Sequence, residues 1–131
     1  MKGEKILLAD FGFSREVEGQ TAGKAFTTVG TFCYQDPAID NGHQESADLW
    51  SLVVTSFELA CLRLPFGPFD TNKYSTIVNY SYRAKKAEFS FTASESERLS
   101  PEFRDLVCRV LKAEPTDRLT FSQLPTHPWM I

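Results

Sequence analysis

A series of short motifs in this 131-residue chain contains the residue types that could do chemistry. In chain order they are Asp10-Phe11-Gly12, Gly30-Thr31-Phe32-Cys33-Tyr34, Asp48-Leu49-Trp50-Ser51, Leu64-Pro65-Phe66, Asp117-Arg118-Leu119-Thr120 and His127-Pro128-Trp129. The carboxylate of Asp10 offers the hard oxygen atoms that magnesium prefers as ligands. Taken alone, however, each motif is a weak signal, and Asp-Phe-Gly after an apolar run is first explained as an ordinary turn.

The elements that must position these motifs can be predicted from hydrophobic patterning. Residues 6–9 are a short apolar run, which predicts a buried strand ended by a turn. Residues 14–30 are polar and rich in Gly and Thr, which predicts a long loop of the kind that is usually functional or disordered. Residues 46–62 are apolar on nearly every face and therefore predict a helix that is buried on all sides.

Residues after this central helix predict three further helices. Residues 76–86 form a mostly polar helical pattern, and residues 92–99 have the composition of a polar loop. Ser100 and Pro101 are a capping residue and a first-turn proline, so they predict the start of a helix, which Pro115 should end. Thr120 and Gln123 have the spacing of a capping box and predict one more short helix. The expected fold class is mainly α.

Composition and charge exclude several functions. The formal net charge of −3 argues against a nucleic-acid-binding protein, and no run of 18 apolar residues is present to span a membrane. Three widely spaced cysteines without a Cys-x-x-Cys motif fit reduced thiols, so a cytoplasmic location is expected. His43 and His127 are the two histidines, which makes a zinc site improbable, and His127 is expected as a core or capping residue.

In their order and spacing the motifs resemble the second half of a eukaryotic serine/threonine protein kinase domain. The resemblance covers essentially all 131 residues. It implies a protein-kinase-like C-terminal lobe with a short β element before the activation loop and a buried central helix. Within this partial kinase domain, residues 10–38 would be the magnesium loop and activation segment, and residues 39–131 the helical lobe.

The resemblance implies ATP and Mg²⁺ as cofactors. Asp10 would hold Mg²⁺ against the ATP phosphates, because the transition state of phosphoryl transfer is rich in negative charge that a cation stabilises. Phe11 would pack as a positional switch, and Gly12 would let the loop turn.

The activation segment would carry the regulatory and substrate-facing threonines. Thr27 resembles the activation-loop phosphorylation site, with Thr28 as the second candidate, although both could be solvated loop residues. A phosphate there would add about −2 charge and could order the loop through arginine side chains. Thr31 resembles the substrate-site threonine of serine/threonine kinases, so serine and threonine hydroxyls of proteins are the implied substrates.

Two residues of the central helix have structural roles in the family. Asp48 resembles the aspartate at the helix start that hydrogen-bonds the catalytic-loop backbone. An aspartate that complements the helix macrodipole is a compatible alternative. Trp50 is expected in the core on either interpretation.

Arg118 resembles the buried arginine that pairs with a glutamate at the end of the activation segment. The glutamate position is Ala38 in this chain. Either Asp36 or Asp40 therefore reaches the arginine, or the lobe is loosely anchored, because an unpaired buried arginine costs about 3–5 kcal/mol.

The family's other catalytic parts precede the magnesium loop. They are the glycine-rich loop, the strand lysine with its helix glutamate, and the His-Arg-Asp catalytic loop, whereas only nine residues precede Asp10 here. No catalytic residue is assigned, the chain alone is expected to be inactive, and Met1 is interpreted as an internal methionine of a longer kinase. Whether the chain by itself is an enzyme stays open. The alternative is a truncated, pseudokinase-like lobe that acts as a protein-interaction module.

Expected partners are protein substrates or regulators, the missing N-terminal lobe or another kinase chain, with no nucleic acid and no membrane. The subfamily is open. The Asp-Phe-Gly-Phe and His-Pro-Trp motifs resemble calcium/calmodulin-kinase-like or autophagy-initiating kinases. Asp48-Leu49-Trp50-Ser51 with residues 64–69 resembles the I-kappa-B-kinase-related group, which we favour.

Overall fold

The computed structural model describes residues 5–7, 9, 32–38 and 45–131. Its α-helices are α1 (Glu45–Cys61), α2 (Tyr74–Lys85), α3 (Ala93–Arg98) and α4 (Pro101–Val110). Its 3₁₀ helices are η1 (Phe32–Tyr34), η3 (Pro115–Asp117), η4 (Leu124–Thr126) and η5 (Pro128–Met130). The described part is therefore mainly helical, which confirms the expected fold class.

The predicted strand at residues 6–9 is not formed among the residues of this run that the structure describes. Residues 5–7 and 9 have no regular secondary structure, and the side chains of Ile6 and Leu7 are exposed. A strand is stabilised by backbone hydrogen bonds to a neighbouring strand. The described residues contain no such neighbour, so the prediction of a buried β element is wrong here.

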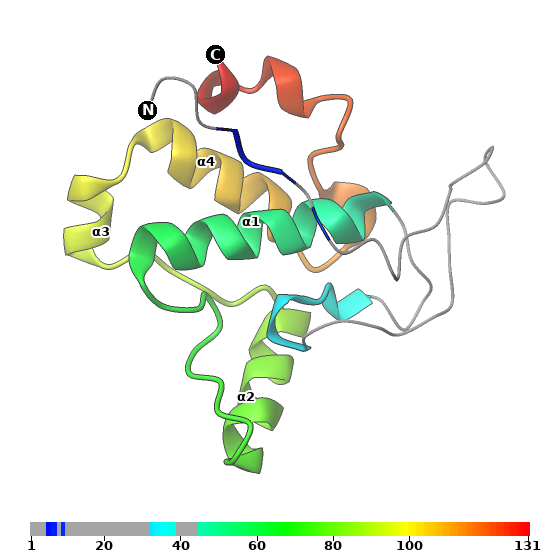
Figure 1. Cartoon of the computed structure of the whole chain (residues 1–131), viewed down its shortest axis with the longest axis vertical. Coiled ribbons are helices and arrows are strands. Elements are labelled where there is room, and N and C mark those ends of the chain that lie inside the picture. The colour runs from blue at the N-terminus through cyan, green and yellow to red at the C-terminus, as the bar shows by residue number, and fades with distance from the viewer. Residues whose placement is uncertain (1–4, 8, 10–31, 39–44) are drawn as a thin grey trace, which may run out of the picture.

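Helix α1 crosses the centre of the molecule and packs against α4 and η1 (Figure 1). Its bounds differ by only one residue from the predicted 46–62. One face is buried and consists of Leu49, Trp50, Val53, Val54 and Phe57. The other face is not, because Leu52 is 51% exposed and Leu59 is 75% exposed. The prediction that the helix is buried on all sides is therefore wrong.

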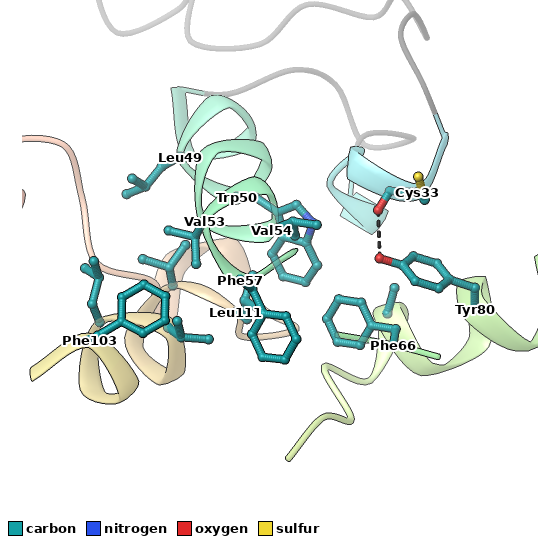
Figure 2. Close-up of a cluster of buried hydrophobic side chains, with 14 residues drawn as sticks. Cys33, Leu49, Trp50, Val53, Val54, Phe57, Phe66, Tyr80, Phe103 and Leu111 are labelled. Atoms are coloured by element: carbon teal, nitrogen blue, oxygen red, sulfur yellow. Dashed lines mark hydrogen bonds between the residues drawn. The ribbon is translucent and has the colours of Figure 1, made fainter. Parts of the chain in front are cut away.

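Aromatic rings fill the space between α1 and α2 (Figure 2). The ring of Phe66 stacks on Trp50 at a centroid distance of 5.6 Å and meets the edge of Tyr80, also at 5.6 Å. Two turns further along α1, Phe57 contacts Phe91 at a centroid distance of 5.5 Å. Such pairs add about 0.5–1.5 kcal/mol each beyond the area they bury. They hold α2 and the connecting loops onto the central helix.

Helix α3 corrects the prediction of a loop over residues 92–99. The Thr92 hydroxyl accepts from the Glu95 N–H at 3.1 Å, and Glu95 Oε1 accepts from the Thr92 N–H at 2.9 Å. This is a capping box, which satisfies two donors that a helix start leaves free. The Thr-x-x-Glu spacing is the sequence signal for this capping box, whereas the polar composition of residues 92–99 indicated a loop.

The ends of the last helices follow the capping signals more closely than the proline signals. Ser100 accepts from the Phe103 N–H at 3.1 Å and Pro101 begins α4, as predicted. However, α4 ends at Val110, and Pro115 begins η3 instead of ending α4.

The predicted capping box between Thr120 and Gln123 is confirmed. The Thr120 N–H donates to Gln123 Oε1 at 3.0 Å, and the Gln123 N–H donates to Thr120 Oγ1 at 3.3 Å. The residues that follow form a turn and then the 3₁₀ helix η4 rather than an α-helix.

His127 fixes the C-terminal segment to α4. Its buried ring accepts from the Trp129 N–H at Nδ1 (3.1 Å), so Nε2 carries the proton and donates to Asp105 Oδ2 at 2.8 Å. This hydrogen bond is the main reason that the pKa of Asp105 is lowered. The expectation of a core and capping histidine is confirmed.

In the part of the chain that the structure describes, no helix is both long enough and apolar enough to cross a membrane. Cys33, Cys61 and Cys108 are all free thiols, of which Cys33 is buried.

Candidate functional site

Residues 32–38 are held against the helices through their main chain. We call these residues the anchored segment. The Ser51 hydroxyl of α1 donates to the Tyr34 carbonyl at 2.7 Å. The Tyr80 hydroxyl of α2 donates to the Cys33 carbonyl at 2.8 Å in a buried contact (Figure 2). Two different helices therefore fix consecutive carbonyl groups.

The side chain of Tyr34 adds a contact to α1. Its hydroxyl donates to Glu58 Oε1 at 2.6 Å. Ionising the phenol would place two negative charges together, so this hydrogen bond raises the pKa of Tyr34 to about 12. Tyr34 therefore stays a neutral donor, and the hydrogen bond persists at neutral pH.

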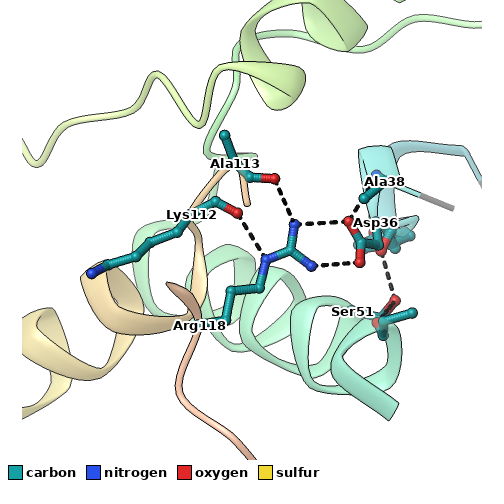
Figure 3. A network of polar contacts seen from close by, with 8 residues as sticks. Asp36, Ala38, Ser51, Lys112, Ala113 and Arg118 are labelled. Carbon is teal, nitrogen blue, oxygen red and sulfur yellow. Dashed lines mark hydrogen bonds and ion pairs between the residues drawn. The ribbon is translucent and has the colours of Figure 1, made fainter. Parts of the chain in front are cut away.

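A buried ion pair closes the end of the anchored segment (Figure 3). Arg118 Nη1 lies 2.5 Å from Asp36 Oδ2, and Arg118 Nη2 lies 2.9 Å from Asp36 Oδ1. This bidentate geometry is the strong form of an arginine–carboxylate pair. Asp36 Oδ1 also accepts from the Ala38 N–H at 2.9 Å. Of the alternatives left open by the sequence, Asp36 is the partner of Arg118.

The Arg118 guanidinium also contacts main-chain carbonyl groups. Its Nε donates to the Lys112 carbonyl at 2.8 Å, and Nη2 lies 3.5 Å from the Ala113 carbonyl (Figure 3). The guanidinium carbon lies 4.5 Å from the centre of the Trp50 ring, within range of a cation–π interaction. Trp50 is fully buried, as predicted, and its ring packs against the guanidinium of the ion pair.

Asp48 is exposed in the first turn of α1. A carboxylate there complements the positive end of the helix macrodipole, which is the second of the two roles considered for it. Its hydrogen bond to a catalytic loop stays a prediction.

The remaining predicted site residues lie outside the described residues. They are Asp10, Phe11, Gly12, Thr27, Thr28 and Thr31, together with Asp40. Among the residues that are described, no group of three or more His, Cys, Asp and Glu side chains could hold a metal ion. The roles of these residues toward Mg²⁺, ATP and substrate therefore stay predictions.

A second ion pair, which sequence reasoning missed, joins α3 to the loop after α1. Arg63 Nη2 lies 2.7 Å from Glu95 Oε1, and Arg63 Nε donates to Glu95 Oε2 at 3.0 Å. Arg63 Nη2 also donates to the Ser90 carbonyl at 2.9 Å. The hydrogen bonds from Arg63, followed by that from the Thr92 N–H, lower the pKa of Glu95 to about 2.

Because the pKa of Glu95 falls from 4.5 to about 2 on folding, its ionised form stabilises the fold above pH 4.5. This contribution is lost as the pH falls from 4.5 toward 2. We expect Glu95→Gln to remove about 1–2 kcal/mol at neutral pH, a modest value since solvent screens the partly exposed Arg63.

The measurement is urea unfolding at a series of pH values through this window. The stability of Glu95→Gln should fall less steeply with acid than that of the wild type. Glu97→Gln, an exposed change on the same helix, is the matched control and should keep the wild-type slope. Equal slopes for wild type and Glu95→Gln would contradict the assignment.

The geometry agrees with a comparison against known families. A model of the protein kinase domain matches residues 1–130. The chain therefore belongs to the protein kinase domain family.

Individual relatives carry kinase names. Calcium/calmodulin-dependent protein kinase cmkB of Emericella nidulans is 34% identical over 128 residues, which are 95% of this chain and 30% of the relative. Developmentally-regulated protein kinase 1 of Dictyostelium discoideum is 36% identical over 131 residues, covering 95% of this chain and 16% of the relative. Aurora kinase of Patiria pectinifera is 35% identical over 133 residues, covering 99% and 29%. The chain thus spans less than a third of each of these relatives, and its resemblance to a particular subfamily stays a prediction.

Proposed function

We propose that this chain forms the substrate-side, C-terminal part of a serine/threonine protein kinase domain. The whole domain would transfer the γ-phosphate of ATP to serine and threonine hydroxyls of proteins. The observation that supports this most is the anchoring of residues 32–38 by α1, α2 and Arg118. Because its main chain is fixed, the anchored segment could position a substrate hydroxyl. Phosphoryl transfer depends mostly on such positioning.

The proposed roles follow from the donor chemistry. Magnesium is usually held by one or two carboxylates together with phosphates and water, so the single carboxylate of Asp10 fits a nucleotide-bound Mg²⁺. The cation would neutralise charge that develops on the transferred phosphoryl group. Thr31 would border the substrate hydroxyl, and Thr27 or Thr28 would accept a regulatory phosphate. Asp36 is not available to a metal, because Arg118 occupies both of its oxygens.

We expect the 131-residue chain by itself not to transfer phosphate. The family's catalytic loop, with its general base, is not among these residues. Lack of a general base alone costs about 10²–10⁴ in rate. Activity should therefore need the ATP-binding lobe and catalytic loop in addition.

The test is to join the chain to the ATP-binding lobe and catalytic loop of a related kinase. Transfer from γ-labelled ATP to serine/threonine peptides is then measured. The joined domain should label the peptides, Asp10→Ala should abolish the labelling, and the exposed Glu97→Ala should not. No labelling by the joined domain, or labelling that survives Asp10→Ala, would overturn the proposal.

A non-catalytic interaction module is the second candidate, because three leucines on α1 and directly after it are exposed. Leu52, Leu59 and Leu62 are 51%, 75% and 88% exposed. If this is the function, the chain should bind a kinase lobe in a pull-down while the joined domain stays inactive. Substituting Leu52 and Leu59 with serine should weaken that binding.

A further inference from the structure

The outer face of α2 presents three apolar or aromatic side chains in one line. Tyr74, Val78 and Tyr82 are spaced four residues apart, so they stack along one side of the helix. Their exposed fractions are 79%, 46% and 58%. The opposite side of α2, with Tyr80 and Ala84, is buried against the core. Helix α2 thus has an apolar stripe on the side that it does not need for folding.

Basic residues flank this apolar stripe at both ends. Residues 73–86 contain Lys73, Arg83, Lys85 and Lys86 and no acidic residue, in a chain with a net charge of −3. The Lys86 ammonium lies 4.2 Å from the centre of the Tyr82 ring and donates to its hydroxyl, so it marks one end of the stripe. Lys73 precedes Tyr74 and marks the other end. Acidic residues flank this basic stretch only beyond its two ends, at Asp70 and Glu88.

Helix α2 also projects away from α1, α3 and α4, as Figure 1 shows. Its exposed side is therefore open to a partner. We propose that this outer face, formed by Tyr74, Val78 and Tyr82 between Lys73 and the Lys85–Lys86 pair, docks an acidic segment of a partner protein that carries apolar side chains. The apolar side chains would pack on the tyrosine rings, and the carboxylates would meet the lysines.

The chemistry of the face favours a protein segment over other anionic partners. Tyrosine is among the residues that contribute most to protein–protein binding energy. A nucleic acid would need a broader basic surface and would be repelled by the negative net charge. A membrane-bound helix usually inserts larger apolar groups such as Trp, Phe and Leu, whereas this stripe has one valine and two tyrosines.

The docking face is separate from the proposed phosphate-transfer site. The inner side of the same helix holds the anchored segment, through the bond from Tyr80 to the Cys33 carbonyl. A partner bound to the outer side would be brought close to this segment without covering it. Binding at this face needs neither ATP nor an ATP-binding lobe. It can therefore be tested independently of the kinase activity.

The test uses the 131-residue chain and a fluorescently labelled peptide of alternating glutamate with leucine and phenylalanine, followed by fluorescence anisotropy. We expect binding that weakens as salt is added. The Tyr74→Ser, Val78→Ser, Tyr82→Ser triple variant and the Lys85→Glu, Lys86→Glu variant should each bind at least about tenfold more weakly. Phe121→Ser and Lys112→Glu, which change exposed residues outside α2, are the matched controls and should bind as the wild type does.

Because all the substituted side chains are exposed, circular dichroism should show the wild-type helix content for every variant. A second peptide with lysine in place of glutamate should not bind. The proposal is overturned if both peptides bind equally, or if the α2 variants bind the acidic peptide as well as the controls do. Tighter, stripe-dependent binding to an oligonucleotide or to phosphatidylserine vesicles would likewise replace the protein partner with that class of ligand.

Discussion

Replacing Arg118 with alanine is expected to lower the free energy of unfolding by about 3–5 kcal/mol, because it leaves the buried Asp36 carboxylate without its charged partner. The substitution also removes the cation over Trp50 and the donor to the Lys112 carbonyl. Whole domains are stable by only about 5–15 kcal/mol. We therefore expect a large shift of the urea unfolding midpoint, measured by circular dichroism.

Two further variants separate loss of the ion pair from a general effect of removing arginine. Arg109→Ala breaks an exposed pair with Asp105 and should cost less than about 0.5 kcal/mol. The double variant Asp36→Leu, Arg118→Met replaces both charges by apolar groups and should recover most of the loss. An Arg118→Ala midpoint equal to the wild type would show that the ion pair does not stabilise the fold.

Replacing Trp50 with alanine is expected to cost a further large amount, about 3–5 kcal/mol. The ring is fully buried, stacks on Phe66 and lies under the Arg118 guanidinium. Its removal would leave a cavity where α1, the aromatic cluster and the ion pair meet. The measurement is urea unfolding followed by circular dichroism, since the substitution itself changes the tryptophan fluorescence.

Leu59→Ala is the control for Trp50→Ala, because it shortens an exposed side chain of the same helix. It should change the free energy of unfolding by less than about 0.5 kcal/mol. A cost for Leu59→Ala that matched the cost for Trp50→Ala would mean that both faces of α1 are covered in solution. That result would contradict the one-sided burial of α1.

Two kinds of feature were predicted correctly from the sequence. They are helix caps, which depend on hydrogen bonds between neighbouring residues, and the pairing of a buried charged side chain. The Thr120–Gln123 capping box and the Ser100 start of α4 are local hydrogen-bonding patterns, so their spacing was informative. Arg118 was expected to be buried and paired, and the absence of a glutamate at position 38 narrowed its partner to Asp36 or Asp40. Only the fold could select between these two aspartates, because the choice depends on where a distant segment lies.

Predictions that depended on neighbouring elements were less successful. The apolar residues on all sides of α1 indicated complete burial, yet Leu52 and Leu59 are exposed because the described residues offer nothing to cover them. The apolar run at residues 6–9 indicated a strand, but a strand cannot form alone. Helix α3 was missed because composition was given more weight than the Thr92–Glu95 spacing.

The separation in sequence between Asp36 and Arg118 has a consequence for how the protein is made. The two residues are 82 positions apart, and Tyr80 is 47 positions from its acceptor at Cys33. During translation, the segment that begins at Phe32 would leave the ribosome long before either of its distant contacts exists. It would acquire its final geometry only once Arg118 had emerged, so this region should fold late, after the residues between its contact partners have been synthesised.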